Sequence, residues 1–227
     1  MSELTIRPVR GLPELREGDD LAHMIRERAD LMDGDIVVVA QKAISKIEGR
    51  IARLDESEKM DVILGEAKRV VRTRGSLVIA ETRHGFICAS AGVDASNAPE
   101  PGTLVLLPVD PDASASGLYD RLGDLTGRKV GVIVTDSFGR PWRQGTTDVA
   151  IGAAGIEVLR DLKGQRDPNG YELKSTVIAI ADEIAGAAQL VMGKLDRTPV
   201  AIVRGLAVAG DGSASELVMP EERNLFS

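Results

Sequence analysis

The chain has 227 residues, with 28 Lys and Arg against 35 Asp and Glu, and a formal net charge of −7. This length fits one large domain, or two small and closely packed ones, with enough chain to bury a core. The acidic balance and an aromatic content of 3% argue against binding to nucleic acid through charge or base stacking. The single cysteine, Cys88, excludes an internal disulfide and a zinc site built from cysteines.

Apolar segments along the chain are short. None approaches the roughly 20 residues that a membrane-spanning helix needs. The first residues are polar and lack the apolar region of a secretory signal. We therefore expect a cytoplasmic protein with no membrane partner and no nucleic-acid partner.

Strand-like and helical patterns alternate along the chain, which predicts an α+β (mixed α/β) fold. Asp19-Asp20 is expected to cap a helix whose apolar positions run from Leu21 to Leu31. The turn 33–35 then leads into Ile36–Ala40, a buried strand.

The middle of the chain carries a helical pattern over Met60–Val71. Two strand candidates, Leu77–Ala80 and Phe86–Ala89, flank His84-Gly85 and predict a hairpin. A further strand is expected at Thr103–Leu107.

The second half is predicted to contain a capped helix beginning near Asp112, a strand at Val130–Thr135 and a strand at Pro199–Arg204. The longest helix is expected at Val177–Met192, ended by Gly193. Neither a repeat nor a linker divides the chain. We therefore treat residues 1–227 as a single unit, with room for two closely packed subdomains and no assignable boundary.

Two aspartates follow strand candidates and precede small or polar residues. Asp94 lies in GVDASN, and Asp136 is followed by Ser137 in VTDSFGR. Carboxylate and hydroxyl oxygens suit Mg²⁺ or Mn²⁺. The alternative is that both aspartates cap turns or helices. Two such segments, with Arg140 and Arg143 nearby, favour a site for metal and phosphate. Asp148 is expected to lie outside it.

Lysines near the first buried strand offer a second group of charges. Lys42 and Lys46 follow the strand and could meet phosphate, although most lysines only solvate a surface. The sequence contains neither a P-loop nor a complete G-x-G-x-x-G motif. A nucleotide would therefore need a different cradle.

Several other reactive or aromatic residues have ordinary explanations. His23 falls in a helical pattern and His84 in a turn, so both are expected to be structural or exposed. Cys88 lies in an apolar strand and is expected to be an inert buried thiol. Trp142 could stack on a ligand ring or pack the loop that carries it.

The segments GLPEL, GDIVVVAQKAISKIEGR, GVDASN, VGVIVTDSFGRPWR, DVAIGAAG and IADEIAGAAQLVMGK occur in an order and spacing that resemble the coenzyme F420-0:gamma-glutamyl ligase family. The resemblance covers nearly the whole chain. It implies a gamma-glutamyl ligase-like fold and an intertwined homodimer. It also leads us to expect a stand-alone ligase, without the nitroreductase-like domain that some bacterial relatives add.

The same resemblance implies a GTP-dependent ligase that adds L-glutamate to coenzyme F420-0, and then further gamma-linked glutamates, through an acyl phosphate. The implied cofactors are two divalent ions, Mg²⁺ or Mn²⁺, and monovalent K⁺. The alternatives are a metal-dependent phosphohydrolase and a non-catalytic nucleotide-binding module.

The resemblance also implies roles for individual residues. Asp94 and Asp136 correspond to metal ligands, and Ser137 to a ligand of the second metal. The nucleotide contacts are Leu12, Pro13, Glu14, Gln41, Lys42, Lys46, Asn97, Met192, Gly193 and Lys194. Lys194 departs from the pattern, because archaeal relatives can offer an acidic metal contact there; it could instead neutralise a phosphate. No residue is assigned as the base for the incoming amine.

Overall fold

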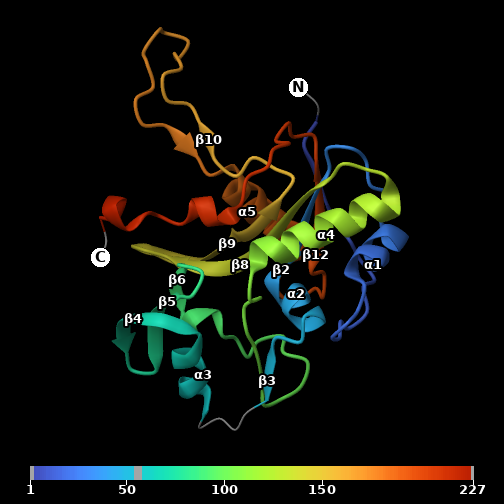
Figure 1. Cartoon of the computed structure of the whole chain (residues 1–227), viewed down its shortest axis with the longest axis vertical. Coiled ribbons are helices and arrows are strands. Elements are labelled where there is room, and N and C mark those ends of the chain that lie inside the picture. Colours follow the sequence, from blue (N-terminus) through green and yellow to red (C-terminus); the bar gives the residue numbers. More distant parts are fainter. Residues whose placement is uncertain (1–2, 54–57, 226–227) are drawn as a thin grey trace.

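A computed structural model describes residues 3–53 and 58–225 of the protein. Its centre is a five-stranded sheet in the order β1-β12-β2-β8-β9 (Figure 1). Neighbouring strands are antiparallel except β2 and β8, which run parallel. The strands are β1 (Thr5–Pro8), β12 (Val200–Arg204), β2 (Ile36–Ala40), β8 (Gly131–Arg140) and β9 (Arg143–Ala154). The expected α+β fold is confirmed.

Helices cover both faces of this sheet. Val37 and Val39 face a core that includes residues of α1 (Leu21–Arg28) and α4 (Pro111–Thr126). Ile36 and Val38 face the opposite core, beneath α5 (Ile180–Met192). Figure 1 shows α4 in front of the sheet and α5 behind it. Because successive side chains in a strand point to opposite faces, β2 has to be apolar at every position.

A second, smaller layer lies below the central sheet in Figure 1. It consists of helix α3 (Lys59–Glu66) and the three-stranded sheet of β4 (Ala67–Arg74), β5 (Leu77–Thr82) and β6 (Ile87–Ala89), and it has its own apolar cluster. Nearby, β3 (Ile51–Arg53) pairs with β7 (Thr103–Val105). The assignment of residues 1–227 to one unit stays a prediction.

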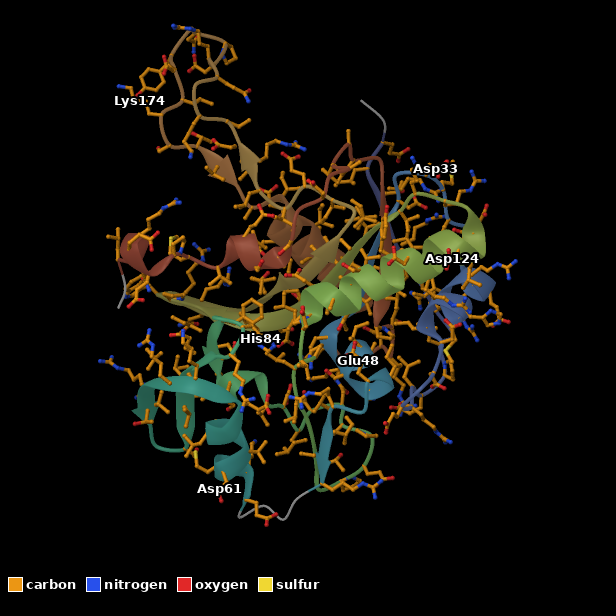
Figure 2. All side chains as sticks on the ribbon, viewed as in Figure 1. Asp33, Glu48, Asp61, His84, Asp124 and Lys174 are labelled. Carbon is orange, nitrogen blue, oxygen red and sulfur yellow. The ribbon has the colours of Figure 1, made fainter. Side chains whose placement is uncertain are left out.

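The remaining elements are short. Helix α2 (Gln41–Ile47) follows β2 directly, and 3₁₀ helices in the described part of the chain cover Ser90–Gly92, Ala214–Leu217 and Glu221–Arg223. Strands β10 (Arg160–Asp161) and β11 (Val177–Ile178) begin an arm that stands off the body in Figure 1. Lys174 lies on this arm in Figure 2.

Several local predictions are confirmed. Asp20 caps α1 by accepting a hydrogen bond of 3.0 Å from the backbone N–H of His23. Strand β2 has the predicted bounds, and β5 and β6 pair as a hairpin. Helix α4 begins close to the predicted position, with Asp110 as its cap. Gly193 ends α5 with a φ of 63°, a conformation that favours glycine.

Two predicted helices are too long. Helix α1 ends at Arg28, and Leu31 is buried beyond it. The pattern over Met60–Val71 is helical only to Glu66, because the following residues form β4 against β5. Val70 and Val71 lie in that strand, as the preference of β-branched side chains for sheets would favour.

The longest described helix is α4, with 16 residues, whereas α5 has 13. Val177 and Ile178, predicted to open α5, instead form β11 and pair with β10. In the ranges 3–53 and 58–225, no helix combines the length and apolar character needed to cross a bilayer.

Candidate active site

The candidate site opens where β2 ends and its neighbour β8 continues. The last pair between the two parallel strands joins Ala40 to Thr135. After Ala40 the chain turns into α2, while β8 runs on to Arg140 in pairing with β9. The predicted end of this strand at Thr135 is therefore wrong, because pairing with β9 extends the strand through Asp136 and Ser137. Beyond the end of β2, a cleft of about 380 Å³ lies beside this extension of β8.

Segments far apart in the sequence meet in this cleft. They are the chain after β1, helix α2, the loop after Asp94, strands β8 and β9, and the end of α5 with the residues that follow it. All ten residues predicted to contact a nucleotide line it: Leu12, Pro13, Glu14, Gln41, Lys42, Lys46, Asn97, Met192, Gly193 and Lys194. Asp136 and Ser137 line it as well. The predicted nucleotide contacts thus lie in one cleft with Asp136 and Ser137, whereas Asp94 is not among the lining residues.

Asp94 is joined to the cleft through Lys42. The Lys42 ammonium donates to Asp94 Oδ2 at 2.6 Å and to Ser96 Oγ at 2.7 Å. Burial raises the pKa of Asp94, but the hydrogen bonds from Lys42 and Ser96 outweigh it and hold this pKa below its usual value. Asp94 is therefore an ionised carboxylate already bound by a cation.

Asp136 lies in a different environment. Burial, with a smaller contribution from the charge of Asp148, raises its pKa to about 6, against the opposing effects of the Ser137 N–H and of two lysines. Those lysines are Lys42 and Lys194. An additional positive charge in the cleft would stabilise the ionised form of the Asp136 carboxylate.

Asp148 belongs to the site, contrary to the sequence prediction. It is 6% exposed, and its Oδ1 accepts a hydrogen bond of 2.6 Å from Ser137 Oγ. Burial also raises the pKa of Asp148. The antiparallel pairing of β8 with β9 brings these two residues opposite each other. A polar residue just before the apolar run 149–154 is the signal that could have identified Asp148.

Gln189 is a further cleft residue that the sequence pattern did not identify, because it falls within the amphipathic pattern of α5. Its Oε1 accepts from the backbone N–H of Asp148 at 3.3 Å, and its Nε2 donates to Ser137 Oγ at 3.5 Å. Lys194 Nζ approaches the same hydroxyl at 3.4 Å. Lys194, the residue that departs from the family pattern, therefore stands beside Ser137.

Helix α2 contributes two lysines, Lys42 and Lys46, and one buried glutamine, Gln41. Lys46 forms an ion pair with Glu14 across the cleft. Gln41 is 2% exposed, and its amide group donates to Leu106 O at 2.9 Å and to Ser45 Oγ at 2.8 Å. Both donor hydrogens of this amide are engaged within the protein, so the Gln41 side chain can offer a ligand only its oxygen.

The oxygen ligands of the site fit a hard divalent ion whose remaining ligands are water or phosphate oxygens. Asp94, Asp136 and Asp148 offer carboxylate oxygens, and Ser137 offers a hydroxyl. Within the described ranges, no group of three or more His, Cys, Asp or Glu side chains is close enough to hold an ion alone. Mg²⁺ characteristically takes one or two carboxylates together with phosphate oxygens and water, which is what this cleft leaves room for.

Other residues singled out from the sequence lie elsewhere. Cys88 is buried, and burial together with the charge of Asp136 raises the pKa of its thiol to about 12, as expected for an inert thiol. His84 Nε2 lies 3.0 Å from the carbonyl oxygens of Pro108 and Val109 (Figure 2). Trp142 is 83% exposed.

Arg140 and Arg143 do not belong to the lining of the cleft, which corrects the weight that the sequence argument placed on them. They pair at the far end of the β8–β9 hairpin, where β8 ends and β9 begins. Arg140 donates to Gln144 O at 3.0 Å. The hairpin carries both guanidinium groups beyond the point where β2 stops.

A second groove, of about 490 Å³, lies between α1, α2 and α4. No lysine lines it, and its arginine, Arg121, is paired with Asp20. Glu48, labelled in Figure 2, accepts from Ser114 Oγ at its edge. Although this groove is larger, Arg121 is the cation that lines it, whereas three lysines, Lys42, Lys46 and Lys194, line the smaller cleft. A phosphate ligand favours the surface with more cationic donors, so the smaller cleft is the candidate active site.

A model of the F420-0:gamma-glutamyl ligase family matches residues 11–205. The chain belongs to this family. It is 44% identical over 246 aligned residues to the coenzyme F420:L-glutamate ligase of Methanopyrus kandleri, covering 98% of this chain and 97% of the relative. The ligase of Archaeoglobus fulgidus is 43% identical, with 96% and 94% covered, and that of Methanocaldococcus jannaschii is 40% identical, with 95% and 94% covered.

The match to the F420-0:gamma-glutamyl ligase family includes every segment that lines the cleft. It begins just before Leu12 and ends just after β12. The arm between β10 and β11 and the layer of β4, β5 and β6 also fall inside it. The family match therefore covers the whole set of residues that the fold brings together.

Proposed function

We propose that the protein is a GTP-dependent ligase that adds L-glutamate, and then further gamma-linked glutamates, to coenzyme F420-0. The observation that carries this proposal is the cleft, in which Lys42, Lys46 and Lys194 face Asp136 and Asp148, in a chain of the gamma-glutamyl ligase family. Lysines can neutralise phosphates, and carboxylates can hold the divalent ion that accompanies them.

The chemistry requires activation of a carboxylate, which is a poor acyl electrophile. A carboxylate oxygen of F420-0 attacks the γ-phosphorus of GTP, and the bond from that phosphorus to the β–γ bridging oxygen breaks. This gives an acyl phosphate and GDP. The amino group of glutamate then attacks the acyl carbon, phosphate leaves, and the nitrogen loses a proton as the amide forms. Neither step needs a nucleophilic side chain of the protein.

The protein's part in such a reaction is positioning and neutralisation of charge. Lys42 and Lys46, one helical turn apart on α2, would bind phosphate oxygens, and Lys194 would approach from the end of α5. The chain at Leu12–Glu14 and Asn97 would contact the rest of the nucleotide. Gln41 would act indirectly, by fixing α2 against the carbonyl of Leu106.

Asp94 and Asp136 would hold one divalent ion, and Ser137 would contribute to a second. When bound, such ions polarise phosphoryl oxygens and offset the charge that develops on them. The Lys42 ammonium forms an ion pair with the Asp94 carboxylate, so it would have to move away from that carboxylate as an ion binds. Mg²⁺ or Mn²⁺ would serve as the divalent ion, and K⁺ as the monovalent ion.

One assay tests the reaction against its alternatives. Purified protein is incubated with GTP, Mn²⁺, glutamate and F420-0, and the products are followed by mass spectrometry and GDP release. The ligase requires both F420-0 and glutamate for GDP release and yields products heavier by glutamyl units. GDP release without either substrate would identify a phosphohydrolase, and binding without turnover a nucleotide-binding module.

We also propose a homodimer with intertwined protomers. Supporting it, two segments project from the body and keep exposed side chains: the arm carries Tyr171, 63% exposed, and the β8–β9 hairpin carries Trp142. Obligate interfaces typically bury on the order of 2,000 Å² or more, which projecting segments can supply. Light scattering at micromolar concentration should give about twice the chain mass, and a monomer would contradict the proposal.

A further inference from the structure

Ser137 and Asp148 face each other directly across β8 and β9. The two residues are register partners in the antiparallel pair, so their side chains lie on the same face of the sheet. The Ser137 hydroxyl donates its only proton to Asp148 Oδ1 at 2.6 Å. This distance lies within the normal range for a hydroxyl that donates to a carboxylate.

The bond determines what the Ser137 oxygen can offer to the cleft. A serine hydroxyl has one proton to donate and two lone pairs to accept with. With the proton on the Asp148 side, the oxygen faces the cleft as an acceptor only. Two donors already approach it there, Gln189 Nε2 at 3.5 Å and Lys194 Nζ at 3.4 Å. Both distances are long for hydrogen bonds, so neither donor occupies the oxygen firmly.

Asp148 is itself held in place. Its residue is 6% exposed, and its backbone N–H donates to Gln189 Oε1 at 3.3 Å. Gln189 thus links α5 to both partners, since its other amide atom approaches Ser137. Lys194, by contrast, is exposed and follows Gly193 at the end of the helix. Asp148 is thus held by burial and by its backbone, whereas Lys194 is exposed to solvent.

From this geometry we infer that Asp148 is a positioning residue, which orients the Ser137 hydroxyl so that its oxygen faces a divalent cation in the cleft. The inference rests on the proposed function, because that function places the ion beside Ser137. Asp148 acts through Ser137 and does not have to touch the ion. The Lys194 ammonium lies 3.4 Å from Ser137 Oγ and would have to move away as an ion binds to that oxygen.

The test measures Mn²⁺ binding to the full chain, from the paramagnetic resonance signal of free Mn²⁺, in the presence of a β,γ-imido analogue of GTP. Loss of the carboxylate that orients a metal ligand typically weakens metal affinity 10- to 100-fold. We expect Asp148→Asn to weaken Mn²⁺ binding by this factor, and Ser137→Ala to do so by a similar one. Because Asp148 acts through Ser137, the double variant should bind Mn²⁺ no more weakly than Ser137→Ala alone.

Asp182→Asn is the matched control. Asp182 is also partly buried and accepts a backbone hydrogen bond, from Ala150 at 2.9 Å, but it lies outside the lining of the cleft. Its substitution should leave Mn²⁺ affinity unchanged. Asp148→Ser is a second variant, with the same expected loss of Mn²⁺ affinity as Asp148→Asn. If one of the two variants fails to fold, the other still tests the inference.

Wild-type affinity in the folded Asp148 variants would overturn the inference, and so would additive losses in the double variant or an unaffected Ser137→Ala. The ligase assay on wild-type protein separates this result from the proposed function. Active wild-type enzyme with normal Mn²⁺ binding in Asp148→Asn would reject the positioning role alone. Inactive wild-type enzyme with the expected Mn²⁺ losses would reject the proposed function alone.

Discussion

Arg204 holds Asp35 in a two-point ion pair, with Nε to Oδ1 and Nη2 to Oδ2 both at 2.6 Å. Asp35 is fully buried just before β2, and Arg204 is the last residue of β12. The carboxylate also accepts from the backbone N–H of Met32 at 2.8 Å, which fixes the turn that leads into β2. This pair therefore sets the start of the strand whose far end opens the cleft.

Arg204→Met should lower the free energy of unfolding by about 3 kcal/mol, because it leaves the Asp35 carboxylate buried without a partner. This is the low end for buried pairs, since the Arg204 side chain is 29% exposed. Urea denaturation provides the measurement. Arg128→Met, which breaks the exposed pair with Asp33 labelled in Figure 2, should change stability by less than about 1 kcal/mol. Equal effects of the two substitutions would contradict the prediction.

Asp136→Asn separates metal binding from a merely structural role. Asparagine keeps the shape of the side chain but removes the charge that a hard divalent ion needs. Ligase activity should fall by orders of magnitude while the fold survives, and the rise in melting temperature caused by Mn²⁺ should shrink. Asp182→Asn serves as the control. Asp148→Asn cannot, because Asp148 lies in the cleft and is bonded to Ser137. Near wild-type activity of Asp136→Asn would place the metal elsewhere.

Lys46→Ala tests the proposed phosphate contact on α2. We expect a loss of about 2 kcal/mol in kcat/KM for GTP, equivalent to roughly 30-fold, from the size of a charged hydrogen bond. Steady-state kinetics with GTP as the varied substrate gives this value. Lys68, on β4 and 63% exposed, is paired with Glu81 far from the cleft, so Lys68→Ala should have wild-type kinetics. Unchanged kinetics in Lys46→Ala would assign that lysine to the pair with Glu14 alone.

The metal-free protein should lose stability as pH rises from about 4 to 6. Burial raises the pKa of Asp136 from 3.8 to about 6, so the folded state binds the proton more tightly than the unfolded state. The contribution of Asp136 to the free energy of unfolding is then most favourable below pH 4, and up to about 3 kcal/mol of it is lost once the pH passes 6. Melting temperatures measured with chelator across this range should fall less in Asp136→Asn. Equal falls in melting temperature for the wild-type protein and for Asp136→Asn would contradict this prediction.

Much of the site could be predicted from the sequence because its residues lie in short continuous motifs. Asp136-Ser137 follows an apolar run, Lys42 and Lys46 follow another, and their spacing along the chain is enough to identify the family. The buried strand Ile36–Ala40 was equally readable, since both of its faces are covered and every position is apolar. Local composition determines features of this kind.

The tertiary structure decided where β8 ends and which carboxylates meet. Asp136 and Ser137 are part of the strand only because β9, the other strand of the hairpin, pairs with them. The same pairing brings Asp148 to 2.6 Å from Ser137, although eleven positions separate them in the sequence. Likewise, residues 67–71 read as helical by spacing but pair with β5. Strand pairing is a contact between two separate segments, so the periodicity within one segment cannot encode it, whereas a motif carries its chemistry within itself.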